Sequence, residues 1–452
     1  MMPTPGTAVT ALRGPALTFV RDPFLVGAEG AVRHEPDALI VIDSGTITAF
    51  GPYEATCDQL PAGATVTRYG SDSLILPGFI DAHVHYPQLQ MIGAGGHALI
   101  DWLNAYAFPA EQQFADADHA REVARIFLRE LLRVGTTTAA VYCTVFPQSV
   151  DAFFEESARL NTRMIAGKVL MDRHAPVALL DTAQRGYDES KALIGRWHGR
   201  GRQLYAITPR FAPTSTPAQM EMTGALWKEH GGTYLQSHVC ESPGEIEWVR
   251  QLYPGRTSYV DVYDHYGQLG PRAVYGHAVW FEENDFRRYH DTGTAIAHCP
   301  TSNLFLGSGL FKIGEASRTD RPVRVGLGTD LGAGTSFSQF ATMNEAYKVA
   351  QLTGHALTAT HAFYLATAGG ARALYLDDRI GSIAPGHEAD LVVLDLHSTP
   401  LIDYRMKHCR DLEEVLFVQL VLADDRAIRA TYVAGHLRHE RGDGSNPPPA
   451  AL

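Results

Sequence analysis

The stretch PGFIDAHVHYPQ, residues 77–88, places two histidines two positions apart at the end of an apolar, β-prone run. Residues two apart in a strand point to the same face, so His83 and His85 would project together, about 6.6 Å apart along the chain. Two imidazoles on one face can share a metal ion. They can equally be two polar residues that line a cleft, so the rest of the chain has to decide.

Seven further β-prone runs follow this stretch, separated by segments with apolar residues at helical spacing. Together with 74–84, the runs are 135–142, 163–170, 203–210, 232–239, 272–278, 293–299 and 323–330. Between two of them, Thr216 as N-cap, Pro217 at the first helical position and Gly231 as a stop predict one helix. Eight strand–helix units between residues 74 and 380 predict an α/β fold, a (β/α)8 TIM-like barrel.

The two ends of the chain have a different pattern. Residues 15–70 contain β-branched runs broken by Ser-Gly and Gly-Pro, and strand-like alternation returns after residue 380. We therefore expect a small β-sandwich domain built from both ends, residues 1–73 and 381–440, beside a barrel over residues 74–380. Residues 441–452 have the composition of a disordered tail.

Composition excludes several classes of protein. A net charge of -12 and the lack of a basic stretch argue against nucleic-acid binding. The five cysteines are scattered without a C-x-x-C pair, which argues against a zinc knuckle and a disulfide framework. The N-terminus lacks a signal-peptide pattern, and no apolar run approaches the roughly 20 residues of a membrane span. We expect a cytoplasmic protein that binds neither nucleic acid nor membrane.

Residues that can bind a metal follow several of the β-prone runs. His83 and His85 end the first run, and the others end on His238 (fifth), His277 (sixth), His298 (seventh) and Asp330 (eighth). The carboxyl ends of barrel strands meet at one rim, where such barrels carry their active sites, so we expect these side chains to converge. Imidazoles and a carboxylate suit a borderline metal such as zinc, with one position left for water. A polar cleft without metal is the alternative, but so many coinciding strand ends weigh against it.

Glu241 lies three residues beyond His238, in SHVCES (237–242). A carboxylate there can move protons at a metal-bound water. It can also belong to the first turn of the next helix, where an acidic residue is favourable. Beside the expected ligands we favour catalysis for Glu241, whereas Cys240 has no base beside it and is expected to be buried packing.

With these motifs, the sequence resembles the amidohydrolase superfamily and, within it, the guanine deaminases. The superfamily pattern is an H-x-H after the first strand, single histidines after the fifth and sixth, and an aspartate after the eighth; it is matched by His83, His85, His238, His277 and Asp330. HCPTSN (298–303) and GLGTD (326–330) are typical of the mononuclear deaminase branch of this superfamily. The narrower match, over about residues 70 to 440, rests on HVHYPQ (83–88), DWLNAYAFPAE (101–111), TPRF (208–211), QSHVCE (236–241) and GLGTDLGAG (326–334). At Tyr86, several members carry a smaller residue, a difference that would reshape the pocket wall.

The resemblance implies one Zn2+ per chain, with Fe2+ as the alternative. The implied ligands are His83, His85, His238 and Asp330. The lysine that bridges two metals in dinuclear members would follow the fourth strand, where this chain reads ITPRFAP (207–213). The implied reaction is deamination of guanine to xanthine and ammonia by a metal-activated hydroxide. Its catalytic residues would be Glu241, Asp330 and His277, and the resemblance also implies a homodimer.

The resemblance also implies a set of contacts to a purine substrate: Gln88, Arg210, Phe211, His238, Glu241 and His277. Without it, Arg210 would be a salt-bridged residue of the rim. We expect His298 to orient a ligand or pocket group rather than bind metal, and GAGGHA (93–98) to be a mobile loop at the pocket mouth.

Two other functions stay open at this stage. One is an aminohydrolase of a related heterocycle, such as a triazine, an oxidised guanine or another aminopurine. The other is a barrel relative that has lost catalysis and serves as a binding protein. Such relatives typically lack several ligands, whereas this sequence has all of them.

Overall fold

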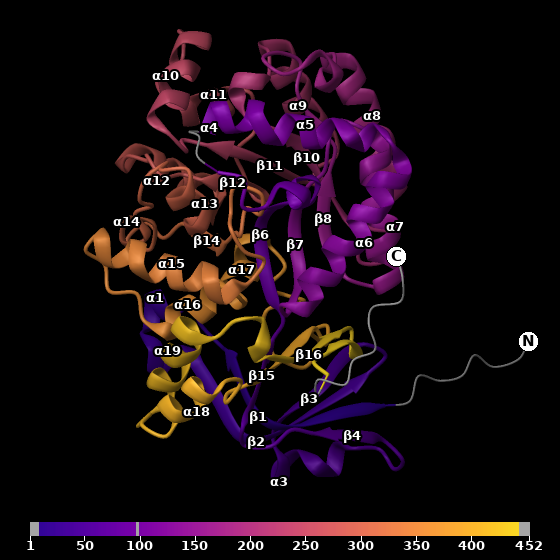
Figure 1. Cartoon of the computed structure of the whole chain (residues 1–452), viewed down its shortest axis with the longest axis vertical. Coiled ribbons are helices and arrows are strands. Elements are labelled where there is room, and N and C mark those ends of the chain that lie inside the picture. The colour runs from indigo at the N-terminus through magenta and orange to yellow at the C-terminus, as the bar shows by residue number, and fades with distance from the viewer. Residues whose placement is uncertain (1–8, 96–98, 443–452) are drawn as a thin grey trace, which may run out of the picture.

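The computed structural model describes residues 9–95 and 99–442, which form two separate sheets (Figure 1). The larger sheet has parallel neighbours in the order β6-β7-β8-β10-β11-β12-β13-β14, with β9 paired to β10. Its strands are β6 (Phe79–His85), β7 (Thr136–Tyr142), β8 (Arg163–Gly167), β9 (Val169–Leu170), β10 (Leu204–Pro209), β11 (Tyr234–Val239), β12 (Ala273–His277), β13 (Ala295–His298) and β14 (Arg324–Leu327). Strand β14 lies beside β6, and just beyond it the Asp330 N–H donates to the His83 carbonyl at 2.8 Å. The sheet therefore nearly closes, and the predicted barrel is confirmed.

Helices cover the outside of this barrel (Figure 1). They are α6 (Ala117–Arg133), α7 (Pro147–Leu160), α8 (Ala183–Trp197), α9 (Pro217–Glu229), α10 (Pro243–Leu252), α11 (Tyr259–His265), α12 (Glu283–Thr292), α13 (Pro300–Phe305), α14 (Ile313–Ala316), α15 (Gln339–Leu352), α16 (Ala359–Leu365) and α17 (Ala368–Ala373). Helix α6 shows why they pack: Val123, Phe127 and Leu131 recur at helical spacing, so one face is apolar and buried. Helix α9 begins as predicted, since the Thr216 side chain accepts the Gln219 N–H at 3.3 Å, but it ends at Glu229, before Gly231.

The smaller sheet combines both ends of the chain. Its strands are β1 (Thr10–Phe19), β2 (Val32–Asp43), β3 (Thr46–Pro52), β4 (Thr65–Arg68), β5 (Ser73–Pro77), β15 (Leu391–Asp395), β16 (Ile428–Val433) and β17 (His436–Glu440). Strand β5 pairs with β1 on one side and with β15 on the other. The indigo and yellow strands therefore lie together in Figure 1, and the predicted second domain from both chain ends is confirmed.

Both faces of this sheet are buried at its centre. Ile75 and Val393 belong to an apolar cluster within the small domain, to which six of its strands contribute. Their neighbours Leu74, Leu76 and Val392 point to the opposite face and join the cluster that includes the barrel helices. Two further helices, α18 (Pro400–Met406) and α19 (Leu412–Leu422), follow β15 in the chain and precede β16. Helix α19 packs against α15 and α16.

The chain crosses from the small sheet to the barrel at Gly78. The Gly78 N–H donates to the Asp390 carbonyl in the small domain at 2.8 Å, and the next N–H, of Phe79, donates to the Gly135 carbonyl in the barrel at 2.9 Å. A Cβ at Gly78 would lie 2.2 Å from Thr137 Oγ1, so the crossing needs glycine. The single strand expected over residues 74–84 is therefore wrong, because β5 and β6 belong to different sheets. The predicted domain boundaries stay predictions.

A buried ionic cluster joins the base of the barrel to the small domain. Arg163, at the start of β8, donates to Glu388 Oε2 at 2.7 Å, and Arg202, before β10, donates to the same oxygen at 2.5 Å. Arg202 also pairs with Asp390, which is 4% exposed. The cluster holds the end of the barrel opposite the predicted active-site rim.

The predictions of a mobile loop and of a disordered tail concern segments that the structure describes only in part. Part of the expected mobile loop (residues 96–98) and most of the expected tail (residues 443–452) lie outside the described residues. Within the described ranges, no helix has the length and apolar character to cross a membrane.

Candidate active site

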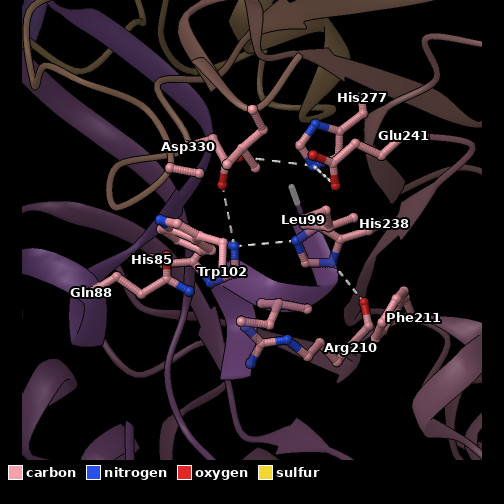
Figure 2. A pocket seen from close by; sticks show the side chains of 13 residues that line it. His85, Gln88, Leu99, Trp102, Arg210, Phe211, His238, Glu241, His277 and Asp330 are labelled. Carbon is pink, nitrogen blue, oxygen red and sulfur yellow. Dashed lines mark hydrogen bonds and ion pairs between the residues drawn. The ribbon is translucent and has the colours of Figure 1, made fainter. Parts of the chain in front are cut away.

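Four side chains from three strand ends meet at the barrel rim. His83 and His85 come from the end of β6, His238 comes from β11, and Asp330 lies just beyond β14. One ligand atom from each lies within 4.8 Å of the others. His83 Nε2 is 3.2 Å and His85 Nε2 3.4 Å from Asp330 Oδ1. His85 Nε2 is 3.2 Å from His238 Nε2, and Figure 2 shows His85, His238 and Asp330 around one point.

The hydrogen bonds of this cluster suit a metal ion. His238 Nδ1 lies 2.6 Å from the Arg210 carbonyl oxygen. Since a carbonyl only accepts, Nδ1 carries the proton and Nε2 keeps a lone pair that faces the cluster. Within the described part of the chain, the buried His83 Nε2 makes no hydrogen bond. His238 Nε2 therefore directs a lone pair into the cluster, and the polar atoms nearest to it and to His83 Nε2 belong to two other candidate ligands, His85 and Asp330.

The pKa values of these four residues also suit a bound metal ion. Burial lowers the pKa of His83 and holds the pKa values of His85 and His238 well below the ordinary histidine value. Burial would raise the pKa of Asp330, but the surrounding imidazoles, His83 first, lower it to about 2. Neutral imidazoles and an ionised carboxylate are the protonation states that a divalent metal needs. The four residues therefore fit a single metal ion.

The backbone turns sharply at the strand ends that carry this site. His277 has a φ of 77°, Asp330 of 49° and Cys240 of 48°, all in the left-handed region that non-glycine residues seldom occupy. Each such residue costs on the order of 1 kcal/mol, which the surrounding structure has to offset. The turn at Cys240, which is buried as predicted, directs Glu241 into the pocket.

Glu241 faces the pocket and does not cap the following helix. Ser308 Oγ donates to Glu241 Oε1 at 3.0 Å, and His277 Nε2 lies 3.4 Å from its other oxygen. Ser242 and Glu245 cap α10 instead, because the Ser242 hydroxyl accepts the Glu245 N–H and Glu245 Oε2 accepts the Ser242 N–H. Burial raises the pKa of Glu241 to about 7, which makes its proton exchangeable near neutral pH.

His277 is oriented by a residue that the sequence analysis did not single out. Its Nδ1 lies 2.8 Å from Asn303 Oδ1. Burial opposes a charge on His277, but Glu241 and Asp330 raise its pKa above the ordinary value. His298, which we expected to orient a ligand or pocket group, packs its ring 4.6 Å from Phe311, and neither ring nitrogen bonds to a described residue. The orienting role expected for His298 is thus filled at His277 by Asn303, from the same HCPTSN motif.

These side chains open into a pocket with an empty volume of about 390 Å³. All of the residues expected to contact substrate line it, together with His85 and Asp330: Gln88, Arg210, Phe211, His238, Glu241 and His277. An apolar wall that the sequence analysis missed completes it: Leu99, Trp102, Leu103, Leu306 and Ala333. Tyr86 lies elsewhere, with its hydroxyl bonded to the Ser149 carbonyl and its ring against Phe114, so it does not reshape the pocket wall as expected.

Arg210 is both a lining residue and one half of a buried ion pair. Its Nη1 donates to both oxygens of Glu111, at 2.8 and 2.7 Å. The Gln88 Nε2 donates to Glu111 Oε1 at 3.2 Å. Figure 2 shows Gln88 and Arg210 on the side of the cluster away from Glu241 and His277. Glu111, the last residue of the motif DWLNAYAFPAE (101–111), has no role predicted from the sequence.

Known proteins resemble this chain over nearly its whole length. Residues 74–438 match the model of the Amidohydrolase family. The guanine deaminase of Escherichia coli (strain K12) is 51% identical over 411 residues, which is 91% of this chain and 93% of that protein. A solved structure of E. coli guanine deaminase matches with a TM-score of 0.93 and 49% identity, over 96% of this chain and 100% of that one. A guanine deaminase structure from C. acetobutylicum, with guanine bound in its active site, gives a TM-score of 0.83 and 26% identity over 95% and 99%.

Proposed function

The chain belongs to the amidohydrolase family, and we propose that it catalyses the hydrolytic deamination of guanine to xanthine and ammonia. The observation that carries the reaction is that Glu241, with a pKa near 7, lines the same pocket as the three-histidine, one-aspartate cluster. The kinship to curated guanine deaminases supports the substrate. A complete set of candidate ligands also disfavours a non-catalytic binding protein.

We propose that His83, His85, His238 and Asp330 hold one divalent ion, zinc or alternatively iron. When bound there, such an ion lowers the pKa of water toward neutral and so makes a nucleophile available. Arg210, not a lysine, follows the fourth barrel strand, β10, which supports one ion rather than two.

The protein's own groups move the protons. As water adds to C2 of guanine, Glu241 gives a proton to the ring nitrogen N3, and Asp330 takes the proton that the water loses. That proton then passes to the C2 amino group, which leaves as ammonia when the C–N bond breaks, while the added hydroxyl becomes the C2 carbonyl of xanthine and its proton restores the Glu241 carboxyl. His277 Nε2 lies 3.4 Å from Glu241 and 3.8 Å from Asp330, a position from which it can orient the water or the leaving group.

The pocket walls position the purine. We propose that Arg210 and Gln88 hydrogen-bond one edge of guanine, while His238, Glu241 and His277 contact it around C2. Phe211 lies with its ring centre 6.5 Å from that of His238 and would close the pocket beside the base. The apolar wall that includes Leu99 and Trp102 suits a flat heterocycle.

We further propose a cytoplasmic homodimer, as the resemblance implies. All five cysteines are free, which suits a reducing compartment. Sedimentation equilibrium of the purified protein measures the assembly, and a mass of one chain would contradict the dimer.

One assay tests the function. The metal-loaded protein is incubated with guanine, and the loss of the guanine ultraviolet band is followed together with the appearance of xanthine. Ammonia release from triazines, 8-oxoguanine and other aminopurines is measured in parallel. If one of these heterocycles reacts with a higher kcat/KM than guanine, the substrate assignment is wrong but the reaction class stands.

A further inference from the structure

Glu111 is a buried carboxylate beside the pocket that the mechanism above does not use. It lies near the end of α5 (Phe108–Gln112) and is 1% exposed. Both of its oxygens accept from Arg210 Nη1, and one also accepts from Gln88 Nε2. One carboxylate therefore holds both side chains that face the far edge of the pocket.

The chemistry of a carboxylate fixes which groups those two side chains offer to a ligand. An ionised carboxylate only accepts hydrogen bonds, so the Gln88 amide must turn its nitrogen to Glu111 and keep its oxygen for another partner. Gly332 leaves room for this arrangement, since a Cβ there would lie 2.2 Å from Gln88 Oε1. Among the described residues, Arg210 Nε and Nη2 have no hydrogen-bond acceptor, and the guanidinium lies 5.3 Å from the Phe108 ring. The pocket thus presents donors from Arg210 beside an acceptor from Gln88.

We propose that Glu111 is a specificity-determining residue, which positions Arg210 and Gln88 so that the pocket selects a lactam edge on a 2-aminopurine. Guanine offers an acceptor (O6) next to a donor (N1–H), the complement of an arginine donor beside a glutamine acceptor. 2,6-Diaminopurine has the same 2-amino group and imidazole ring but the reverse order, a donor amino group next to an acceptor nitrogen. Both of its groups would be mispaired in the pocket. The proposal rests on the proposed function, because it places that edge against Arg210 and Gln88.

The test compares Glu111→Gln with wild type on guanine and on 2,6-diaminopurine, with ammonia release as the common readout. A glutamine has nearly the same volume but can donate as well as accept, so it no longer forces the Gln88 amide into one orientation. We expect the KM for guanine to rise at least tenfold while kcat stays within about threefold. The ratio of kcat/KM for guanine to that for 2,6-diaminopurine should fall at least tenfold. Glu122→Gln, an exposed glutamate on α6, is the matched control and should keep the wild-type ratio.

A merely structural role predicts a different result. If Glu111 only stabilises the fold, both purines lose activity equally and the ratio stays at its wild-type value, which overturns the proposal. Glu111→Asp covers the case in which the glutamine variant does not fold: it still only accepts, so KM rises but the preference for guanine remains. Loss of that preference in a folded Glu111→Asp variant also overturns the proposal.

Binding separates this proposal from the proposed function. Calorimetric titration of each variant with the two purines gives the same selectivity as a ratio of Kd values. If wild type binds guanine without converting it to xanthine, the deaminase proposal fails, and the ratio of Kd values in Glu111→Gln still decides the role of Glu111.

Discussion

Replacing Glu241 by glutamine is the sharpest test of the proposed chemistry. The substitution keeps the volume of the side chain, and the amide oxygen can still accept the Ser308 hydroxyl, which now lies 3.0 Å from Oε1. The substitution removes the Glu241 carboxyl group, whose pKa is about 7 and which can therefore donate a proton near neutral pH. General acid catalysis contributes about 10²–10⁴ in rate, or about 3 to 5 kcal/mol of barrier. We expect kcat on guanine to fall by that factor while KM and metal content stay near the wild-type values.

The pH profile checks the same assignment. Glu241 acts as an acid only when protonated, and its protonated fraction falls tenfold per unit above a pKa of about 7. Wild-type kcat/KM should therefore fall above pH 7, and Glu241→Gln should lose this dependence. Glu247→Gln, an exposed position on α10, is the control. The alternative role as a helix cap predicts nearly normal turnover and a loss of about 1 kcal/mol of stability, and that result would refute the reasoning.

Three other predictions follow from the same structure. The purified protein should hold about one equivalent of zinc or iron per chain, and chelation should abolish activity and lower the melting temperature, because the ion binds only the folded site; two ions per fully active chain would contradict a single site. Arg210→Ala should lose most of kcat/KM on guanine, and more than Gln88→Ala, since a charged donor makes the stronger hydrogen bond; unchanged kinetics in Arg210→Ala would leave it as a rim residue. Arg202→Met should destabilise the fold by about 3 kcal/mol in urea unfolding, because it leaves the buried Asp390 without a cationic partner, and KM should not change; a change in KM without loss of stability would contradict this structural role.

The barrel could be predicted because its strands are short apolar runs that end on polar residues. His238, for example, lies one residue before the end of both the predicted run and strand β11, which stop at Val239. The crossing at Gly78 could not be predicted in the same way. Strands buried on both faces read as continuous apolar runs, so the pattern over residues 74–84 contains no signal that the chain changes sheets. Only the hydrogen bonds of Gly78 and Phe79 show it.

The same distinction applies to the site. The residues proposed as metal ligands lie at strand ends or one turn beyond, where the barrel rule directs attention. Glu111, Asn303 and Ser308 lie on helices and loops between strands, and each acts through a partner that is distant in sequence: Arg210, His277 and Glu241 respectively. No periodicity in a single sequence encodes such pairs. The quoted motifs did contain Glu111 and Asn303, so resemblance located them without giving their contacts.

Closure of the barrel brings His83 and Asp330, two of the proposed metal ligands, together. Asp81, on β6, accepts the His83 N–H at 3.1 Å and the Thr329 N–H at 3.0 Å, and its other oxygen accepts the Thr329 hydroxyl. This carboxylate therefore ties the first barrel strand to the segment that carries Asp330. Gly328 lies where the segment after β14 meets β6. A Cβ at Gly328 would lie 2.8 Å from His83 Cβ, so glycine lets the two segments approach closely. The distance of 3.2 Å between His83 Nε2 and Asp330 Oδ1 is thus set by contacts between these two segments of the chain.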